Sequence, residues 1–249
     1  MGNNFFCPKP IIDILSKPKK SSKVSSQLIY GEKFKILSRG KNYIKVKSIY
    51  DRYTGYISPG KFKSGYKPTH KIVSLKSKIY FGKNDKFKSS KSYLPFLSEI
   101  EILKSTRHMV MFEKDRWVKK KEILSLNSKF NNYYKIFKLF LNCPYKWGGK
   151  TYKGIDCSAL VQMYYKFNRK FFPRDTKDQI KVNRGLNFKK AYNKGNLIYW
   201  NGHVAICLSK KTLIHAYGPK KKVIIMPIKE TVNIVKKTAK LEVKKFFSI

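Results

Sequence analysis

The chain has 249 residues, of which 42% are hydrophobic, so it can bury one large core or two to three smaller ones and is not a disordered tail. Its 56 lysine and arginine residues against 14 aspartate and glutamate residues give a formal net charge of +42, a balance often associated with nucleic acid, anionic membranes or acidic polymers. Lysine, however, far outnumbers arginine and is spread from end to end, as A/T-rich codon usage would produce. We therefore expect a solvated lysine surface, with no specific nucleic-acid partner.

The sequence shows neither a secretory signal nor a cysteine pattern typical of disulfides or zinc. Residues 1–14 lack a basic region followed by an apolar run, and no stretch approaches the ~20 apolar residues that span a membrane. The cysteines are few, irregularly spaced and without a CxxC pair, which argues against a disulfide framework and a structural zinc site; they are Cys7, Cys143, Cys157 and Cys207. We expect a cytoplasmic protein with no membrane span, metal or cofactor.

The first part of the chain alternates apolar and polar residues and is broken by frequent turns. This pattern predicts short β-strands that close a small all-β barrel, which we assign to residues 1–66. The expected strands cover residues 25–29, 34–36, 43–46 and 53–57, with a turn at 39–42.

A second unit, assigned to residues 67–127, repeats the first loosely. Strands are expected around Ile79, around Leu94, at 100–103 and at Trp117, with a turn near residues 82–85. Both units resemble bacterial SH3-like domains, which end their barrel with a Gly-aromatic-Val pattern. The first copy has this pattern at 55–57, and the second copy lacks the glycine. His70 and His108 lie in these units without comparable partners and are expected at the surface.

The hydrophobic period changes after Asn127. Helical spacing predicts a helix from Tyr133 to Leu141 that ends before Pro144, and a second helix from Ser158 to about Phe167. Four turn-separated strands follow at 197–200, 203–208, 212–217 and 222–227. Helices followed by an antiparallel sheet predict an α+β domain, assigned to residues 128–249.

Cys157 stands where a short loop turns into the second of these helices, just after Gly148 and Gly149. The free N–H groups and positive dipole end of a helix start favour a thiolate. The same N–H groups could stabilise the oxyanion that forms when sulfur attacks a carbonyl. Cys157 is therefore a candidate nucleophile, although a lone cysteine can equally be a small buried hydrophobe.

Two histidines downstream strengthen the nucleophile hypothesis. Residues 203–215 read as a β-hairpin with its turn at 208–210, and a register that pairs Ala205 with Leu213 places His203 directly opposite His215. One imidazole could then deprotonate Cys157 while the other fixes its tautomer. Simple packing of either histidine, or a metal bound by the three side chains, remains an alternative.

At these residues the chain closely resembles the NlpC-type cysteine peptidases, a papain-like family that hydrolyses bacterial cell-wall peptides. The resemblance covers roughly residues 128–228 and rests on segments 144–149, 154–162, 173–179, 202–206 and 214–216. It implies that Cys157 is the nucleophile, His203 the general base and then acid, and His215 the residue that orients His203. It further implies that the hydroxyl of Tyr145 assists the oxyanion site. Ala159 departs from the usual glycine after Cys-Ser, a change that a helix tolerates.

Two SH3-like units before an NlpC-type domain resemble the γ-D-glutamyl-L-diamino acid endopeptidases. This resemblance implies cleavage of murein stem peptides between D-Glu and the diamino acid. The substrates would be stem peptides that already carry a free N-terminal L-Ala. By the same resemblance the first unit forms one side of the active-site cleft. Asp175 and Tyr53 would hold the substrate ammonium group, with Thr176 and Ser158 as adjacent polar contacts. Each has a structural alternative: Asp175 as a helix N-cap or partner of Arg174, Tyr53 as a rim aromatic, and Ser158 as a first-turn helix residue.

The expected function is thus muropeptide recycling in the cytoplasm. One rival is an exported hydrolase that acts on intact wall, and another is a non-catalytic module that binds wall polymer or nucleic acid. The sequence leaves open the preferred diamino acid, the stem length, the oligomeric state and the role of the second SH3-like unit. Glu32, in a turn of the first unit, receives no function.

Overall fold

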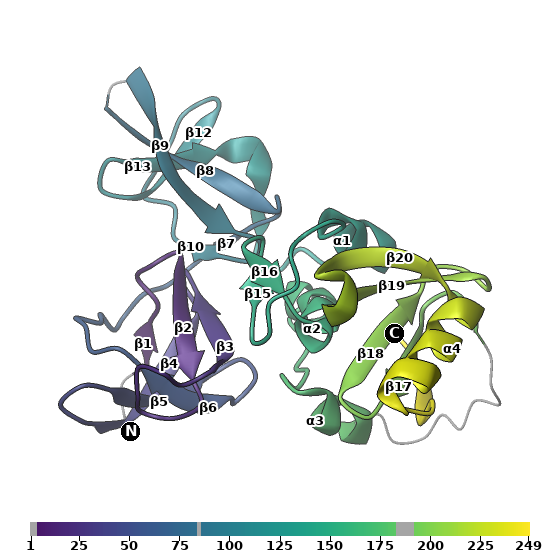
Figure 1. The fold of residues 1–249 in the computed structure, drawn as a ribbon. Helices are drawn as coiled ribbons and strands as arrows, with labels where there is room; N and C mark the ends of the chain where they lie inside the picture. Colours follow the sequence, from purple (N-terminus) through teal and green to yellow (C-terminus); the bar gives the residue numbers. More distant parts are fainter. Residues whose placement is uncertain (1–3, 84–85, 183–191) are drawn as a thin grey trace. The chain divides into compact units, whose positions relative to one another are not determined.

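The computed structural model describes residues 4–83, 86–182 and 192–249, and the chain divides into two units, one up to Lys129 and one from Phe130 to Ile249 (Figure 1). Each unit contains its own sheets and is described by itself. Within the described ranges, no helix has both the length and the apolar character needed to cross a membrane.

The first sheet of the N-terminal unit has six antiparallel strands in the order β1-β4-β5-β6-β2-β3. Alternation explains its core: in β4, Phe34 is buried between exposed Lys33 and Lys35. The buried residues are Cys7, Ile14, Leu28, Phe34, Ile44, Val46 and Ile57. The strands are β1 (Phe5–Phe6), β2 (Ile11–Leu15), β3 (Val24–Ile29), β4 (Lys33–Arg39), β5 (Ile44–Ser48) and β6 (Thr54–Ile57).

Gly55 permits the contact between β2 and β6. A Cβ atom at this position would lie 2.7 Å from the carbonyl oxygen of Leu15 and would overlap the side chain of Ile14. Only glycine lets the two strands approach this closely. The glycine in the pattern at 55–57 is therefore explained by packing.

The rest of the N-terminal unit forms two further sheets. A three-stranded sheet has the order β10-β7-β14, and a five-stranded sheet has the order β11-β12-β13-β8-β9. The elements are β7 (His70–Ile72), β8 (Lys76–Lys83), β9 (Lys86–Pro95), β10 (Glu99–Ile100), β11 (Lys104–Ser105), β12 (Met109–Glu113), β13 (Arg116–Lys119), the 3-10 helix η1 (Lys120–Glu122) and β14 (Ile123–Ser125).

Tyr30, which follows β3, joins the two halves of the N-terminal unit. Its ring is fully buried and belongs to the core of the second half, where it packs edge-on against Phe112. Its hydroxyl donates a hydrogen bond to Glu113 Oε1 at 2.9 Å, and its carbonyl oxygen accepts one from the Glu99 N–H at 2.9 Å. Burial raises the pKa of this phenol, so the hydroxyl remains a donor.

The C-terminal unit is built on a five-stranded antiparallel sheet in the order β20-β19-β18-β17-β21. Helix α2 packs against β18 and β19, and the buried side of α4 packs with residues of the sheet such as Ala205 and Cys207. The elements are α1 (Tyr133–Leu139), β15 (Lys150–Thr151), β16 (Gly154–Ile155), α2 (Cys157–Phe167), α3 (Thr176–Val182), β17 (Asn196–Trp200), β18 (His203–Cys207), β19 (Thr212–Tyr217), the 3-10 helix η2 (Gly218–Lys220), β20 (Lys222–Pro227), α4 (Ile228–Ala239) and β21 (Lys245–Ser248).

The predicted α+β class is confirmed, with differences in detail. The first helix ends at Leu139 rather than Leu141, and the expected order of helices followed by a sheet is incomplete because α4 and β21 come after β20. Helix α3 was anticipated only through the alternative role of Asp175 as a helix N-cap, since Gln179 is its only buried residue and its sequence has no apolar period. Closure of the SH3-like sheets into barrels stays a prediction, and part of the turn expected at 82–85 lies outside the described residues.

The two histidines of the N-terminal unit differ. His108 is exposed as expected. His70 is half-buried, pairs with Thr69 Oγ1 at 2.9 Å, and has its pKa lowered by burial. His70 is therefore only partly exposed at the surface, on β7 between β10 and β14.

Candidate active site

Cys157 is the first residue of α2, one residue before the predicted first residue of the helix, Ser158. Asp156 is the N-cap: its backbone is extended, and its Oδ1 accepts the Ala159 N–H at 2.9 Å. Cys157 is 6% exposed, and its Sγ lies 4.0 Å from the carbonyl oxygen of Gly202. The N–H groups of Ser158 and Val204 donate to the same sulfur. The thiol therefore sits against the backbone on both sides of His203.

Burial favours the neutral form of the Cys157 thiol. Burial, with a smaller contribution from the Asp156 carboxylate, raises the pKa of Cys157 to about 12, although the two N–H donors and Arg174 oppose this shift. The helix start thus lowers the pKa as expected, but desolvation outweighs it. Burial thus opposes the thiolate that the helix start favours, and a base that removes the thiol proton during attack would overcome this opposition.

Arg174 holds the start of α2 in place. Its guanidinium is 2% exposed and binds both carboxylate oxygens of Asp156, with Nη1 to Oδ1 at 2.9 Å and Nη2 to Oδ2 at 2.6 Å. Asp156 Oδ2 also accepts the Gly148 N–H at 2.9 Å. One buried bidentate pair therefore fixes both the helix start and the glycine loop that precedes it.

Sequence reasoning missed this role, because Arg174 was considered only as a partner of Asp175. The signal that could have found it is the choice of arginine in a lysine-rich chain, since only a guanidinium binds a carboxylate with two parallel hydrogen bonds.

Ser158 belongs to the same buried network. Its Oγ donates to Asp156 Oδ1 at 3.1 Å and accepts from Arg174 Nη1 at 2.9 Å. Gln179, a second residue that sequence reasoning missed, is fully buried and donates to the carbonyl oxygens of Ser158 and Pro173 at 3.0 and 2.9 Å. The Ser158 hydroxyl is therefore engaged internally, and its contact with substrate stays a prediction.

His203 and His215 are brought together, but by a different register from the expected one. The strands pair Ile206 with Ile214 and Cys207 with Leu213, so the hairpin is shifted by two residues and the two histidines lie diagonally rather than directly opposite. A shift of two keeps both side chains on one face. His203 Nε2 and His215 Nδ1 still lie 3.0 Å apart.

The surroundings of His215 determine which ring nitrogens carry protons. Its ring is fully buried, stacks on Tyr217 at 4.6 Å between centroids, and places Nε2 3.3 Å from Met226 Sδ. A thioether can only accept, so the His215 proton lies on Nε2 and its Nδ1 accepts from His203 Nε2. His203 Nδ1 is then the unprotonated nitrogen.

Burial favours the neutral form of both imidazoles. Burial lowers the pKa of His203 to about 4, and burial with the neighbouring ring lowers that of His215 to about 3. His203 Nδ1 therefore offers a lone pair that can take the thiol proton.

Tyr145 lies beside this group. Its backbone N–H donates to the Lys221 carbonyl oxygen at 2.8 Å, and its ring packs near Gly218. Burial first, and then the charges that Cys157 and Asp156 can carry, raises the pKa of the phenol. Within the described residues its hydroxyl has no hydrogen-bond partner. A protonated, unused donor near the sulfur fits the predicted support of an oxyanion.

Asp175 and Thr176 lie at the start of α3, and both are half-buried. The backbone carbonyl of Asp175 accepts from the N–H groups of Asp178 and Gln179 at 3.0 and 2.9 Å, whereas its carboxylate forms no hydrogen bond or ion pair with a described residue. Burial raises its pKa, and Arg174 and Lys177 oppose the shift. The alternative role as partner of Arg174 is thus wrong, since that guanidinium binds Asp156.

Tyr53 belongs to the N-terminal unit, where it is half-buried just before β6 and packs at the edge of the first sheet's core. Its N–H donates to Asp51 Oδ1 at 3.2 Å, and its carbonyl oxygen accepts from Ser48. These contacts fit a rim aromatic. Its role in substrate binding stays a prediction.

The structure gives no metal-binding geometry in the part of the chain that it describes: no three His, Cys, Asp or Glu side chains are grouped to hold an ion. The four cysteines are free thiols. Glu32, which received no function from the sequence, is 3% exposed and accepts the Ile29 N–H at 2.8 Å, so it stabilises the turn after β3.

Comparison with known proteins finds two matching families. Residues 142–240 match the NlpC/P60 family, and residues 14–60 match the bacterial dipeptidyl-peptidase SH3 domain. The chain is 36% identical over 81 residues to a dipeptidyl-peptidase 6 of Lysinibacillus sphaericus, covering 31% of this chain and 28% of that protein. It is 28% identical over 169 residues to a γ-D-glutamyl-L-lysine dipeptidyl-peptidase of Bacillus cereus, covering 60% and 50%.

The chain thus spans half or less of the length of these curated relatives. A solved NlpC/P60 family protein from Bacillus cereus has a similar fold, with a TM-score of 0.77, 18% identity and coverage of 90% of this chain and 94% of that one. This chain therefore carries an NlpC/P60 domain, of a family of cysteine peptidases, together with a bacterial SH3 domain of the dipeptidyl-peptidase type.

Proposed function

We propose that this protein is a cysteine endopeptidase that cleaves murein stem peptides between D-Glu and the diamino acid, on its γ-amide bond, and requires a free N-terminal L-Ala. The observation that carries the proposal is Cys157 at the start of α2, with its Sγ 4.0 Å from the carbonyl oxygen of Gly202, together with the His203–His215 contact of 3.0 Å that begins at the next residue. The name of the Bacillus cereus relative, a γ-D-glutamyl-L-lysine dipeptidyl-peptidase, supports the same class of bond.

The geometry suggests the following reaction. His203 Nδ1 takes the proton of the Cys157 thiol as the sulfur attacks the γ-carbonyl carbon. First-turn N–H groups and the Tyr145 hydroxyl stabilise the oxyanion, and His203 then protonates the leaving amine. Water, deprotonated by His203, hydrolyses the thioester, releasing L-Ala-D-Glu and restoring the thiol.

Selection for a free amine is assigned to Asp175. Its half-buried carboxylate has no side-chain partner among the described residues, so it is available to an ammonium group. Peptides still attached to the wall through their N-terminus carry no such group. A requirement for it points to released muropeptides and hence to recycling in the cytoplasm.

The test compares three substrates with the purified protein: L-Ala-γ-D-Glu-diaminopimelate, the same peptide with an acetylated amine, and intact sacculi. We expect cleavage of the first alone, and none by the Cys157→Ala variant. Cleavage of sacculi would favour an exported wall hydrolase, and binding without cleavage a non-catalytic module. A lysine-containing peptide tested in parallel reports the preferred diamino acid.

The Asp175→Asn variant tests amine selection. We expect its KM for the free peptide to rise about tenfold or more, because a charge-assisted hydrogen bond to the ammonium is lost. The matched control is Asp178→Asn, which removes the same charge from the same helix at a carboxylate whose side chain is 48% exposed. Equal KM values for the two variants would remove Asp175 from the amine site.

A further inference from the structure

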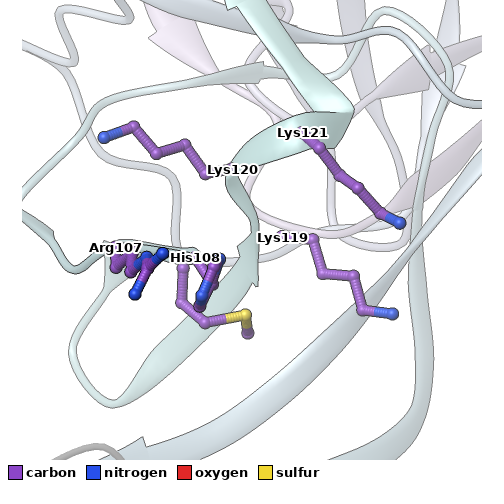
Figure 2. A pocket seen from close by; sticks show the side chains of 6 residues that line it. Arg107, His108, Lys119, Lys120 and Lys121 are labelled. Atoms are coloured by element: carbon purple, nitrogen blue, oxygen red, sulfur yellow. The ribbon is translucent and has the colours of Figure 1, made fainter.

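The second half of the N-terminal unit contains a basic pocket of about 430 Å³, lined by Arg107, His108, Met109, Lys119, Lys120 and Lys121 (Figure 2). We call this feature the basic pocket. It lies outside residues 14–60 and 142–240, so neither family match covers it.

Main-chain pairing builds the pocket. Antiparallel pairing of β12 with β13 places Met109 opposite Lys119, and the Lys120 N–H donates to the His108 carbonyl oxygen at 2.8 Å. These contacts hold two short basic segments of the chain side by side. Figure 2 shows Arg107, His108 and Lys120 on one side of the opening and Lys119 and Lys121 on the other. Met109 is 7% exposed and supplies an apolar floor.

The lining has no carboxylate to balance its charge. Within the ranges that the structure describes, Arg107, Lys120 and Lys121 form no ion pair, and all three are exposed. The Lys119 ammonium lies 5.8 Å from the centre of the Tyr80 ring. Four cations held around one opening repel one another, and a bound anion would relieve this repulsion.

The composition of the lining narrows the ligand. An arginine fork, three ammonium groups and an imidazole match the oxygens of phosphate groups. No Phe, Tyr or Trp lines the pocket, so bases have no aromatic surface on which to stack. We propose that the basic pocket binds a compact phosphate-bearing anion with at least two negative charges, and that this binding is independent of peptide hydrolysis.

The test measures binding of pyrophosphate to the full-length protein by calorimetry at about 150 mM salt, where the Debye length is about 8 Å and diffuse charge is largely screened. We expect saturable one-to-one binding. The Lys120→Glu/Lys121→Glu variant should weaken it about tenfold or more, which corresponds to about 1.4 kcal/mol. The control Lys19→Glu/Lys20→Glu makes the same charge change at an exposed turn of the first sheet and should change the affinity less than about twofold.

Equal weakening in the two double variants would overturn the proposal, because net charge alone would then explain binding. Absence of saturable binding of pyrophosphate to the wild type would also overturn it. So would duplex DNA whose affinity falls in the Lys120→Glu/Lys121→Glu variant while the affinity for pyrophosphate stays the same. Competition with polyglycerol phosphate identifies the source of the phosphate groups that the pocket binds. If the polymer binds more strongly than pyrophosphate at equal phosphate concentration, the site is assigned to a polymer. If it binds more weakly, the site is assigned to a free anion. Hydrolysis of the tripeptide should be unchanged in both variants.

Discussion

Met226 sets the proton positions in the histidine pair through a contact that the sequence could not reveal. Its thioether accepts from His215 Nε2, so the neighbouring His203 presents an unprotonated Nδ1. Without an acceptor at this place, the two rings could exchange to tautomers that leave the proton on His203 Nδ1. The base that activates Cys157 would then be blocked.

We therefore expect Met226→Leu to lower kcat/KM about tenfold, the effect of a tautomer preference worth about 1.4 kcal/mol. Met163→Leu, another fully buried methionine of the same unit, is the matched control and should leave kcat/KM within about twofold. Nitrogen NMR of the two imidazoles reports the tautomers directly. Unchanged tautomers together with a lower rate would show that Met226 acts by packing alone.

The same burial makes the folded state sensitive to acid. An unfolded histidine has a pKa of about 6.5, whereas those of His203 and His215 are lowered to about 4 and about 3. At a pH between the unfolded and folded pKa values, these histidines are protonated in the unfolded chain but not in the native protein. The free energy of unfolding therefore falls as the pH drops from about 6.5 towards 4. Denaturant midpoints at pH 7 and 4.5 should show a smaller difference in His203→Asn/His215→Asn than in the wild type. An identical difference would contradict neutral buried histidines.

At the scale of single residues, the sequence predicted that His203 and His215 lie together, but not the strand register that brings them together or the contact with Met226. A two-residue shift of the hairpin leaves His203 and His215 on one face, so spacing alone cannot distinguish the two registers. The partner Met226 lies on another strand, and its contact depends on the packed sheet. Cys157 was identified at the helix start, while its raised pKa depends on burial that a local pattern does not report.

At the scale of elements, the start of α2 depends on the Asp156–Arg174 pair. Removing one member of a buried ion pair leaves an uncompensated charge and typically costs about 3–5 kcal/mol. We expect such a loss of unfolding free energy in Arg174→Ala, and a smaller one, about 1–2 kcal/mol, in Arg174→Lys, which cannot bind both oxygens.

Arg169→Lys is the matched control, because Arg169 is exposed, and it should change the unfolding free energy by less than about 0.5 kcal/mol. Denaturant unfolding measures all three variants, and the rate of Cys157 alkylation reports whether the helix start has moved. An Arg174→Lys protein as stable as the wild type would show that the bidentate geometry is dispensable.

The elements found from the sequence were those with clear periodicity. Strands β19 and β20 were predicted at their observed bounds, and α2 within one residue. Short strands such as β10 and β11 are too brief to show a period of two, and α4 follows Pro227 with a polar residue, Thr231, among the few that it buries. Its buried face, formed by Ile228, Thr231 and Val235, becomes clear only once the sheet is present.

At the scale of the whole molecule, the net charge of +42 should affect how fast acidic substrates arrive. We expect kcat/KM for the acidic tripeptide to fall when salt is raised from about 50 to about 300 mM, since exposed charges are then screened over a few ångströms. A peptide with amidated carboxylates should show little change. Equal salt effects on the two peptides would assign the dependence to protein stability instead.

Composition predicted a folded, lysine-rich protein, and the motifs around Cys157 predicted the catalytic domain. Features that depend on contacts between residues far apart in the chain could not be predicted from the sequence. The basic pocket combines residues 107–109 with residues 119–121, which no local pattern in the sequence connects. The carboxylate that binds Arg174 belongs to Asp156, 18 residues upstream.

Tyr30 makes the two halves of the N-terminal unit depend on each other for folding, although the sequence repeat suggests two independent domains. Because its ring completes the core of the second half and its hydroxyl bonds Glu113, a fragment ending near residue 66 would expose an aromatic ring and leave a cavity in what remains. The two halves should therefore melt in a single cooperative transition. For expressing one part of this protein alone, the natural place to divide the chain is near Lys129.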